Sequence, residues 1–274
     1  MTERPLILFT NDDGIQSPGI YAAAQACLDL AEILIVAPQE QQSGAGRSMP
    51  SRNEGRVYPK EFTFGDQTFI GYGIEGSPAQ VVQHALLEFA SRKPDLVISG
   101  INYGENVGEG ITVSGTIGAA MEAASVNIPA LAVSRQTLPE YHLSHSNEID
   151  FGVAGHFTRL FAERVLRKGL PIETDVLKIE VPQSATLDTP LRWTRLSRQR
   201  YFYALKPHRR RPTDPGPLGY EVRVLADTLE PDSDIKAAIV DQVIAVTAIK
   251  LDLTAPIDFA QLGSWFASSA QPQS

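Results

Sequence analysis

Short apolar runs alternate with helix-like segments through the first two thirds of the chain. Runs this short, bounded by turn residues, are typical of strands that are buried on both faces of a sheet. We expect such strands at 5–9, 32–37, 95–100 and 130–134. The helix-like segments lie at 19–31, 77–90, 114–126 and 149–168. This alternation predicts an α/β fold with a doubly wound, mostly parallel sheet.

The last third of the chain has a different pattern. Five strand-like segments follow one another without regular helices between them, at 176–182, 191–197, 201–207, 220–225 and 243–254. A basic, proline-rich loop at 208–217 separates two of them and is expected to be a solvated hairpin tip or an intersubunit contact. We therefore predict a core at residues 1–180 and a β-rich extension at 181–274 that completes it.

Composition narrows the class of protein. No apolar run approaches the roughly 20 residues that a membrane-spanning helix needs. The formal net charge of −8 argues against a stable nucleic-acid complex, because phosphate backbones require a basic surface. Cys27 is the single cysteine, so no intrachain disulfide can form and a cytoplasmic protein is expected.

Polar residues follow three of the predicted strands, in the loops 10–14, 38–44 and 100–108. Ligands in open parallel sheets bind at the carboxyl ends of strands, so we expect these loops to meet at one rim. Asp12 and Asp13 are adjacent carboxylates directly after a buried strand, and a shared divalent cation would relieve their repulsion. The loops contain no Cys or His, and an all-oxygen site suits Mg²⁺ or Mn²⁺.

The segment Ser114-Gly115-Thr116 opens the predicted helix that follows the third loop. Free backbone N–H groups and the positive end of the dipole make a helix start a site for anions such as phosphate. Ser114 could also simply cap the helix, and the two roles are compatible.

Two other patterns resemble binding sites, one for a dinucleotide and one for a metal ion. The sequence GYGIEG at 71–76 matches a dinucleotide-binding fingerprint, but the acidic residue Asp95 begins a strand instead of ending one, which argues against it. His142 and His145 could be metal ligands, but they lie in a loop-like context and are expected to be solvated.

Three motifs together resemble the SurE family of survival-protein nucleotidases: ILFTNDDGIQSPGI, VAPQEQQSGAG and PDLVISGINYGENVGEGITVSGTIGAAMEA. Their order and spacing agree with the family over about residues 5–135. The resemblance implies a Rossmann-like core with a C-terminal β-hairpin and tail that help build homodimers or homotetramers. It also implies a divalent-metal-dependent phosphatase of nucleoside monophosphates, and some members also act on polyphosphate.

The resemblance places one Mg²⁺ or Mn²⁺ ion per subunit. The positions that match its ligands are Asp12, Asp13, Ser43 and Asn102. The positions that match the phosphate-binding residues are Asn106, Ser114, Gly115 and Thr116. The predicted catalytic residues are Asp12, Asp13 and Asn106, with Asp12 preferred for orienting or deprotonating the attacking water.

The expected activity is hydrolysis of 5′- or 3′-nucleoside monophosphates. A non-catalytic metal and nucleotide sensor with the same pocket remains the alternative, and a structural oligomer built by the β-rich part is a third possibility. The preferred base, the sugar position, the physiological metal and the role of the arginine loop at 209–211 stay open at this point.

Overall fold

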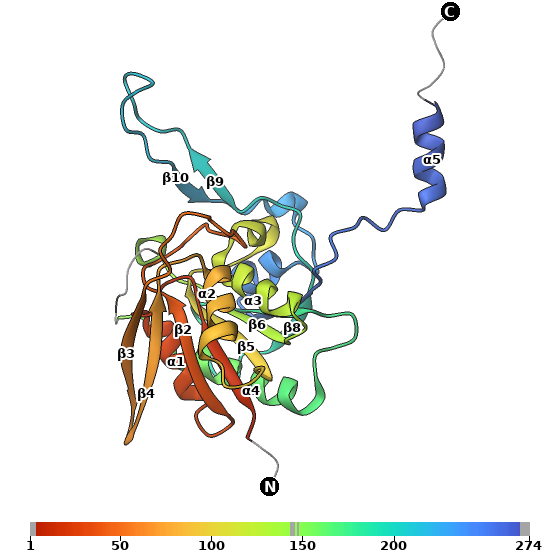
Figure 1. Cartoon of the computed structure of the whole chain (residues 1–274). Helices are drawn as coiled ribbons and strands as arrows, with labels where there is room; N and C mark the ends of the chain where they lie inside the picture. The colour runs from red at the N-terminus through yellow and green to blue at the C-terminus, as the bar shows by residue number, and fades with distance from the viewer. Residues whose placement is uncertain (1–3, 143–145, 147, 269–274) are drawn as a thin grey trace, which may run out of the picture.

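A nine-stranded sheet forms the centre of the protein in a computed structural model that describes residues 4–142, 146 and 148–268 (Figure 1). Its strands are β1 (Leu6–Thr10), β2 (Glu32–Pro38), β3 (Val57–Phe64), β4 (Gln67–Ile74), β5 (Leu96–Tyr103), β6 (Ala130–Arg135), β7 (Val176–Val181), β8 (Leu191–Thr194) and β11 (Ile244–Ile249). Their order across the sheet is β3-β4-β2-β1-β5-β6-β7-β11-β8. β1 lies between β2 and β5, so the order in which strands are added to the sheet reverses direction at β1.

The strands from β4 to β7 in this order are parallel, whereas β3 pairs with β4 and β11 with β7 in the antiparallel sense. The predicted α/β fold with a mostly parallel sheet is therefore confirmed. β8 and β11 join the same sheet, so chain from beyond residue 180 forms its far edge.

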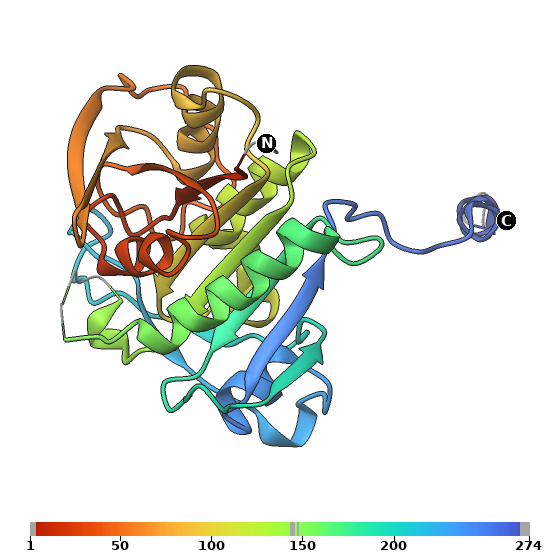
Figure 2. The ribbon, with the colours of Figure 1, turned by 90° about the horizontal axis from the view of Figure 1, so that it is seen from below.

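Helices cover both faces of the sheet. α1 (Pro18–Ala26) packs beside α4 (Gly152–Lys168), and α2 (Pro78–His84) packs beside α3 (Gly115–Ser125). Figure 2 shows α4 lying along one face of the strands. Alternate side chains of β1 serve the two cores: Ile7 and Phe9 join the α1–α4 side, and Leu8 joins the α2–α3 side. This two-sided burial explains why the strand is apolar at every position up to Thr10.

β5 is longer than the sequence pattern predicted. The expected strand stops at Gly100, but β5 continues to Tyr103 and shifts its register against β6 between Ser99 and Asn102. Gly100 has a φ of +132° and lies so close to β6 that a Cβ would be 2.2 Å from the carbonyl oxygen of Val133. Only glycine fits there, and the strand carries Asn102 to the rim as part of β5.

Two C-terminal elements extend from the body. β9 (Phe202–Leu205) and β10 (Gly219–Val222) form a separate antiparallel hairpin. α5 (Phe259–Ser268), which the sequence pattern did not predict, stands away from the sheet at the end of an extended segment (Figure 1). A short helical segment, Ile235–Val240, also interrupts the strands that were expected to follow one another. Within the described ranges, none of the helices has the length and apolar character needed to cross a bilayer.

Candidate active site

The carboxyl ends of β1, β2 and β5 place the predicted site residues around one cavity of about 370 Å³. The members of the predicted set that line this cavity are Asp12, Ser43, Asn102, Asn106 and Ser114. They come from four separate segments of the chain, because β1 pairs directly with both β2 and β5 and α3 begins beside the end of β5. The topology therefore gathers carboxylate, hydroxyl and amide oxygens at one rim.

Asp12 is buried, and its carboxylate faces the start of α3. The hydroxyl of Thr116 donates a hydrogen bond to Oδ1 of Asp12. Gly115 packs so closely that a Cβ there would lie 2.6 Å from Cβ of Asp12. Burial raises the pKa of Asp12, while the Thr116 hydroxyl and nearby backbone N–H groups lower it. Among the described residues no cationic side chain contributes to this balance.

Asp13 is buried beside Asp12 and does not line the cavity. Its Oδ1 accepts a hydrogen bond from Nε2 of Gln41 at 3.0 Å, and its Oδ2 accepts one from the backbone N–H of Tyr103 at 3.0 Å. Burial, and then the charge of Asp12, raise the pKa of Asp13 well above its usual value. Each oxygen still has acceptor capacity beyond these hydrogen bonds.

Asn102 and Ser43 present neutral oxygens beside Asp12. The side-chain amide nitrogen of Asn102 donates to the carbonyl oxygens of Tyr103 and Gly104, at 3.2 and 2.8 Å. Both amide hydrogens are therefore used within the loop, and Oδ1 of Asn102 is the atom available to a ligand. Ser43 is exposed at the cavity wall, and the backbone N–H of Gln42 donates to the carbonyl oxygen of Asp12 at 2.7 Å, which ties this loop to the rim.

This donor set fits a hard divalent cation. It offers carboxylate, amide and hydroxyl oxygens, which are the ligands that Mg²⁺ and Mn²⁺ prefer. The part of the chain that the structure describes holds no group of three or more His, Cys, Asp or Glu side chains that could bind a metal instead. The two adjacent buried carboxylates, whose pKa values are both raised by burial, would be neutralised by such an ion.

The start of α3 differs in detail from the predicted phosphate cradle. Oγ of Ser114 accepts a hydrogen bond from the N–H of Ile117 at 3.2 Å, so this serine does cap the helix, and it also lines the cavity. Thr116 is fully buried, and its hydroxyl is directed to Asp12. The backbone N–H groups of Gly115 and Thr116 also act on Asp12, whose pKa they lower. The helix start thus holds a carboxylate of the site.

Asn106 lies over a buried ionic cluster formed by Lys178, Glu180 and Asp234. Its backbone N–H donates to Oε2 of Glu180 at 3.0 Å, and its carbonyl oxygen accepts from Nζ of Lys178 at 2.9 Å. Nζ of Lys178 also lies 3.0 Å from Oδ2 of Asp234 and 3.4 Å from Oε1 of Glu180. Burial raises the pKa of Glu180 to about 7, despite the attraction of Lys178. This cluster fixes the backbone that presents Asn106 to the cavity.

Sequence reasoning missed one wall of the cavity. Phe202 and Tyr220 of the β9–β10 hairpin line it together with His142 and Arg200. Nδ1 of His142 lies 2.7 Å from the hydroxyl oxygen of Tyr220, so this histidine is half-buried against the hairpin, whereas His145 lies outside the described residues. The run of aromatic residues Tyr201-Phe202-Tyr203 was the available signal, but only the folded hairpin brings Phe202 to the rim.

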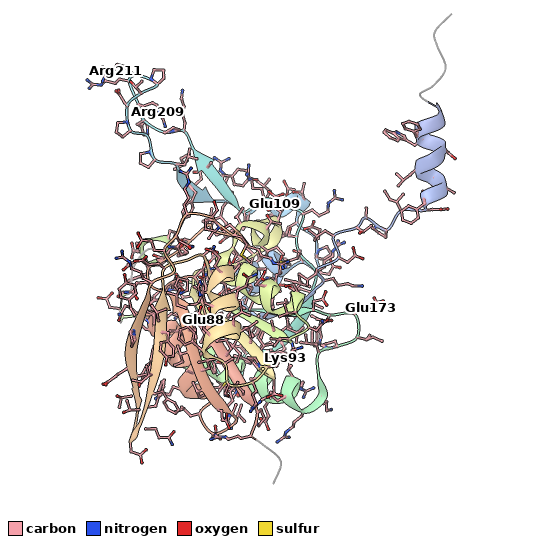
Figure 3. The ribbon with its side chains drawn as sticks, viewed as in Figure 1. Glu88, Lys93, Glu109, Glu173, Arg209 and Arg211 are labelled. Carbon is pink, nitrogen blue, oxygen red and sulfur yellow. The ribbon has the colours of Figure 1, made fainter. Side chains whose placement is uncertain are left out.

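The arginine loop at the hairpin tip is not part of the cavity. Arg209 and Arg211 lie at the far end of the hairpin, away from the body (Figure 3). Arg209 donates to the carbonyl oxygens of Pro212 and Gly216, and Arg211 pairs with Asp214. These contacts shape the loop itself.

The fold and the rim together define a mostly parallel α/β protein of the metal-dependent kind, with an oxygen-lined cavity at the carboxyl ends of its strands. The chain matches the family model described as survival protein SurE over residues 7–203, and it belongs to this family. It is 41% identical over 258 residues to the 5′-nucleotidase SurE of Thermococcus gammatolerans, covering 93% of this chain and 94% of the relative. It is 39% identical to the protein of the same name from Thermococcus kodakarensis, covering 93% and 96%.

A solved structure supports the same assignment. The crystal structure of the SurE protein from Aquifex aeolicus superposes with a TM-score of 0.73 at 28% sequence identity. The match covers 97% of this chain and 100% of the other. The likeness therefore extends beyond the residues of the family model into the C-terminal part.

Proposed function

We propose that this chain is a divalent-metal-dependent nucleotidase that hydrolyses nucleoside monophosphates to nucleoside and phosphate in the cavity at the β1–β5 rim. The observation that supports this most strongly is the convergence of Asp12, Ser43, Asn102 and Asn106 on one cavity. The names of the relatives, 5′-nucleotidase SurE, point to the same reaction. They favour turnover over a non-catalytic sensor with the same pocket.

Asp12, Asp13, Ser43 and Asn102 are proposed to hold one Mg²⁺ or Mn²⁺ ion. Such an ion would supply positive charge to offset that of the substrate phosphate and would make water more acidic. Asp13 is outside the cavity lining, so its proposed role depends on the remaining acceptor capacity of its carboxylate.

The side chains of this protein have distinct roles in the proposal. The carboxylate of Asp12 orients the attacking water and accepts its proton. Thr116 positions Asp12 through the hydrogen bond from its hydroxyl. Asn106 and Ser114 donate hydrogen bonds to phosphate oxygens, and the α3 dipole adds its positive end.

A substrate panel tests this function. The purified protein, first treated with a chelator, is assayed for phosphate release from AMP, GMP, 3′-AMP and short polyphosphate, with Mg²⁺, with Mn²⁺ and with EDTA. We expect release from at least one nucleotide with metal and none with EDTA. Tight nucleotide binding without phosphate release under every metal condition would instead support the sensor.

We further propose a homodimer or homotetramer built through the extension at 181–274. α5 exposes apolar side chains, with Phe259, Trp265 and Phe266 exposed at 80%, 74% and 74%. Large exposed apolar patches on soluble proteins mark interaction sites, and a second copy of the chain is the proposed partner. Replacing Trp265 by Asp should shift the mass measured by light scattering towards the monomer; an unchanged mass would count against this role of α5.

We also propose that the chain consists of a core at residues 1–180 and an extension at 181–274. A cytoplasmic location, expected from the single cysteine, is part of the same proposal. β8 and β11 support an extension that completes the sheet, and Phe202 and Tyr220 support one that also completes the cavity.

A further inference from the structure

Glu105 is a buried acid in the cavity wall that the proposed mechanism does not use. It lies between Asn102 and Asn106 in the loop after β5, is only 6% exposed, and lines the same cavity. Its Oε1 accepts a hydrogen bond from the hydroxyl of Tyr201 at 2.7 Å. Its Oε2 is buried and has no hydrogen-bond partner among the described residues. A buried carboxylate oxygen of this kind is costly unless a ligand supplies a donor.

The charges near Glu105 make this oxygen an acceptor for neutral donors and not a site for a second anion. Lys178 is already shared between the buried carboxylates of Glu180 and Asp234, so its charge is used within that cluster. The negative charge of Glu105 raises the pKa of Glu180, and it acts in the same direction on the hydroxyls of Tyr201 and Tyr220. A phosphate would be repelled here, whereas a hydroxyl group would donate to Oε2.

The position of Glu105 links the two ends of the cavity. Asn106, the next residue in the chain, belongs to the proposed phosphate end of the cavity. Tyr201, which donates a hydrogen bond to Glu105, directly precedes Phe202, one of the two aromatic hairpin residues that line the cavity. The rings of Phe202 and Tyr220 meet edge to face with centroids 5.4 Å apart. A nucleotide with its phosphate at the rim and its base against these rings places its ribose beside the acid.

We propose that Glu105 accepts a hydrogen bond from the ribose 2′-hydroxyl of the substrate and thereby selects ribonucleotides over 2′-deoxyribonucleotides. Carboxylates recognise ribose hydroxyls in the same way in dinucleotide-binding folds. A deoxyribose leaves Oε2 of Glu105 unpaired in a buried site, which is the kind of defect that gives strong discrimination. The inference rests on the proposed nucleotidase activity and adds a specificity residue to it.

The test compares kcat/KM for AMP and 2′-deoxy-AMP with Mn²⁺. We expect the wild type to prefer AMP by about 10- to 100-fold, the cost of leaving one buried acceptor without a donor. Glu105→Leu removes both acceptors and should bring this ratio close to one, mainly by raising KM for AMP. Glu105→Gln keeps an oxygen for Tyr201 and should give an intermediate ratio. Glu61→Gln, which changes an exposed acid of β3 that does not line the cavity, is the control and should keep the wild-type ratio.

Two results would overturn the inference: equal kcat/KM for the two nucleotides in the wild type, or a wild-type ratio in the Glu105→Leu variant. If Glu105→Leu does not fold, as judged by its circular dichroism and melting, Glu105→Gln decides, and an unchanged ratio in that variant overturns the inference. Phenyl phosphate, which has no sugar, is assayed in parallel with the wild type. If neither nucleotide nor phenyl phosphate is hydrolysed with any metal, the proposed function fails and the inference fails with it.

Discussion

Two buried acidic clusters lie close together at this rim, and they are balanced in different ways. Glu180 and Asp234 surround the ammonium group of Lys178, which is itself fully buried. Asp12 and Asp13 are equally buried, but the groups that lower their pKa values are neutral: backbone N–H groups, the hydroxyl of Thr116 and the amide of Gln41. One cluster contains its own cation, and the other is surrounded by donors without a charge.

The difference separates a structural ionic cluster from a binding site. Burying charges is costly unless they are paired, and Lys178 meets this requirement within the chain. At Asp12, which opens onto the cavity, hydrogen bonds hold the carboxylate in place without neutralising it. We therefore infer that a bound divalent ion supplies the positive charge at Asp12 and Asp13.

Asp12→Asn should lower phosphate release from a nucleoside monophosphate by about 10³-fold or more. The change removes a charge that the cation requires and the acceptor for the proton of the water. The melting temperature of the metal-free protein should stay the same or rise, because one of two repelling carboxylates is gone. Asp66→Asn, on the exposed β3–β4 turn, is the control and should keep wild-type turnover. More than a tenth of wild-type activity in Asp12→Asn would refute its role.

Lys178→Met should lower the free energy of unfolding by about 3–5 kcal/mol, because it leaves buried carboxylates without their partner. Lys236→Met removes a surface lysine paired with Asp241 and should cost only about 0–1 kcal/mol. Urea denaturation of the three proteins measures both values. Similar losses in the two variants would contradict the contrast between the buried and the exposed pair.

Glu180 should make stability depend on pH. Its pKa is about 7 in the folded chain against about 4.3 for an unperturbed glutamate, so between these values the folded state keeps a proton that the unfolded state has lost. Stability should therefore fall as pH rises from about 4.5 to about 7, by on the order of 3 kcal/mol, and this contribution should change no further above that range.

Glu180→Gln should remove this part of the pH dependence, while Glu109→Gln at the surface should retain it. The measurement is the free energy of unfolding against pH for the wild type and both variants in chelator. Parallel curves for the wild type and Glu180→Gln would show that Glu180 titrates normally.

Thr116→Val should lower kcat by about 10- to 100-fold, which is typical of losing a group that orients a metal ligand. Thr116→Ser keeps a hydroxyl for Asp12 and should recover most of the activity. The two variants differ chiefly in this hydrogen bond, so equal activities would place the role of Thr116 in packing alone.

The strands and the oxygen-rich rim could be predicted from sequence because both follow from local pattern. Apolar runs mark the strands, and parallel topology brings the ends of β1, β2 and β5 together, so Asp12, Ser43 and Asn102 could be expected at one place. The alternation in VLKIEV also puts Lys178 and Glu180 on the same face of β7, so this part of the buried ionic cluster could have been predicted as well.

The remaining features depend on contacts between distant segments. From sequence alone, the hydroxyl of Thr116 could donate to a phosphate or to Asp12. It donates to Asp12 because the start of α3 packs against the end of β1. His142 and Tyr220 meet across 78 residues of sequence, and no periodicity encodes that pairing. β5 passes the glycine at which the strand was expected to stop, because close packing of Gly100 on β6 lets the strand continue.

Binding of Mn²⁺ to chelator-treated protein, followed through the electron paramagnetic resonance signal of the free ion, tests whether the rim holds a cation. We expect one bound ion per wild-type chain and loss of that binding in Asp12→Asn, with Lys236→Met binding as the wild type does. Wild-type Mn²⁺ affinity and stoichiometry in the Asp12→Asn variant would contradict this expectation.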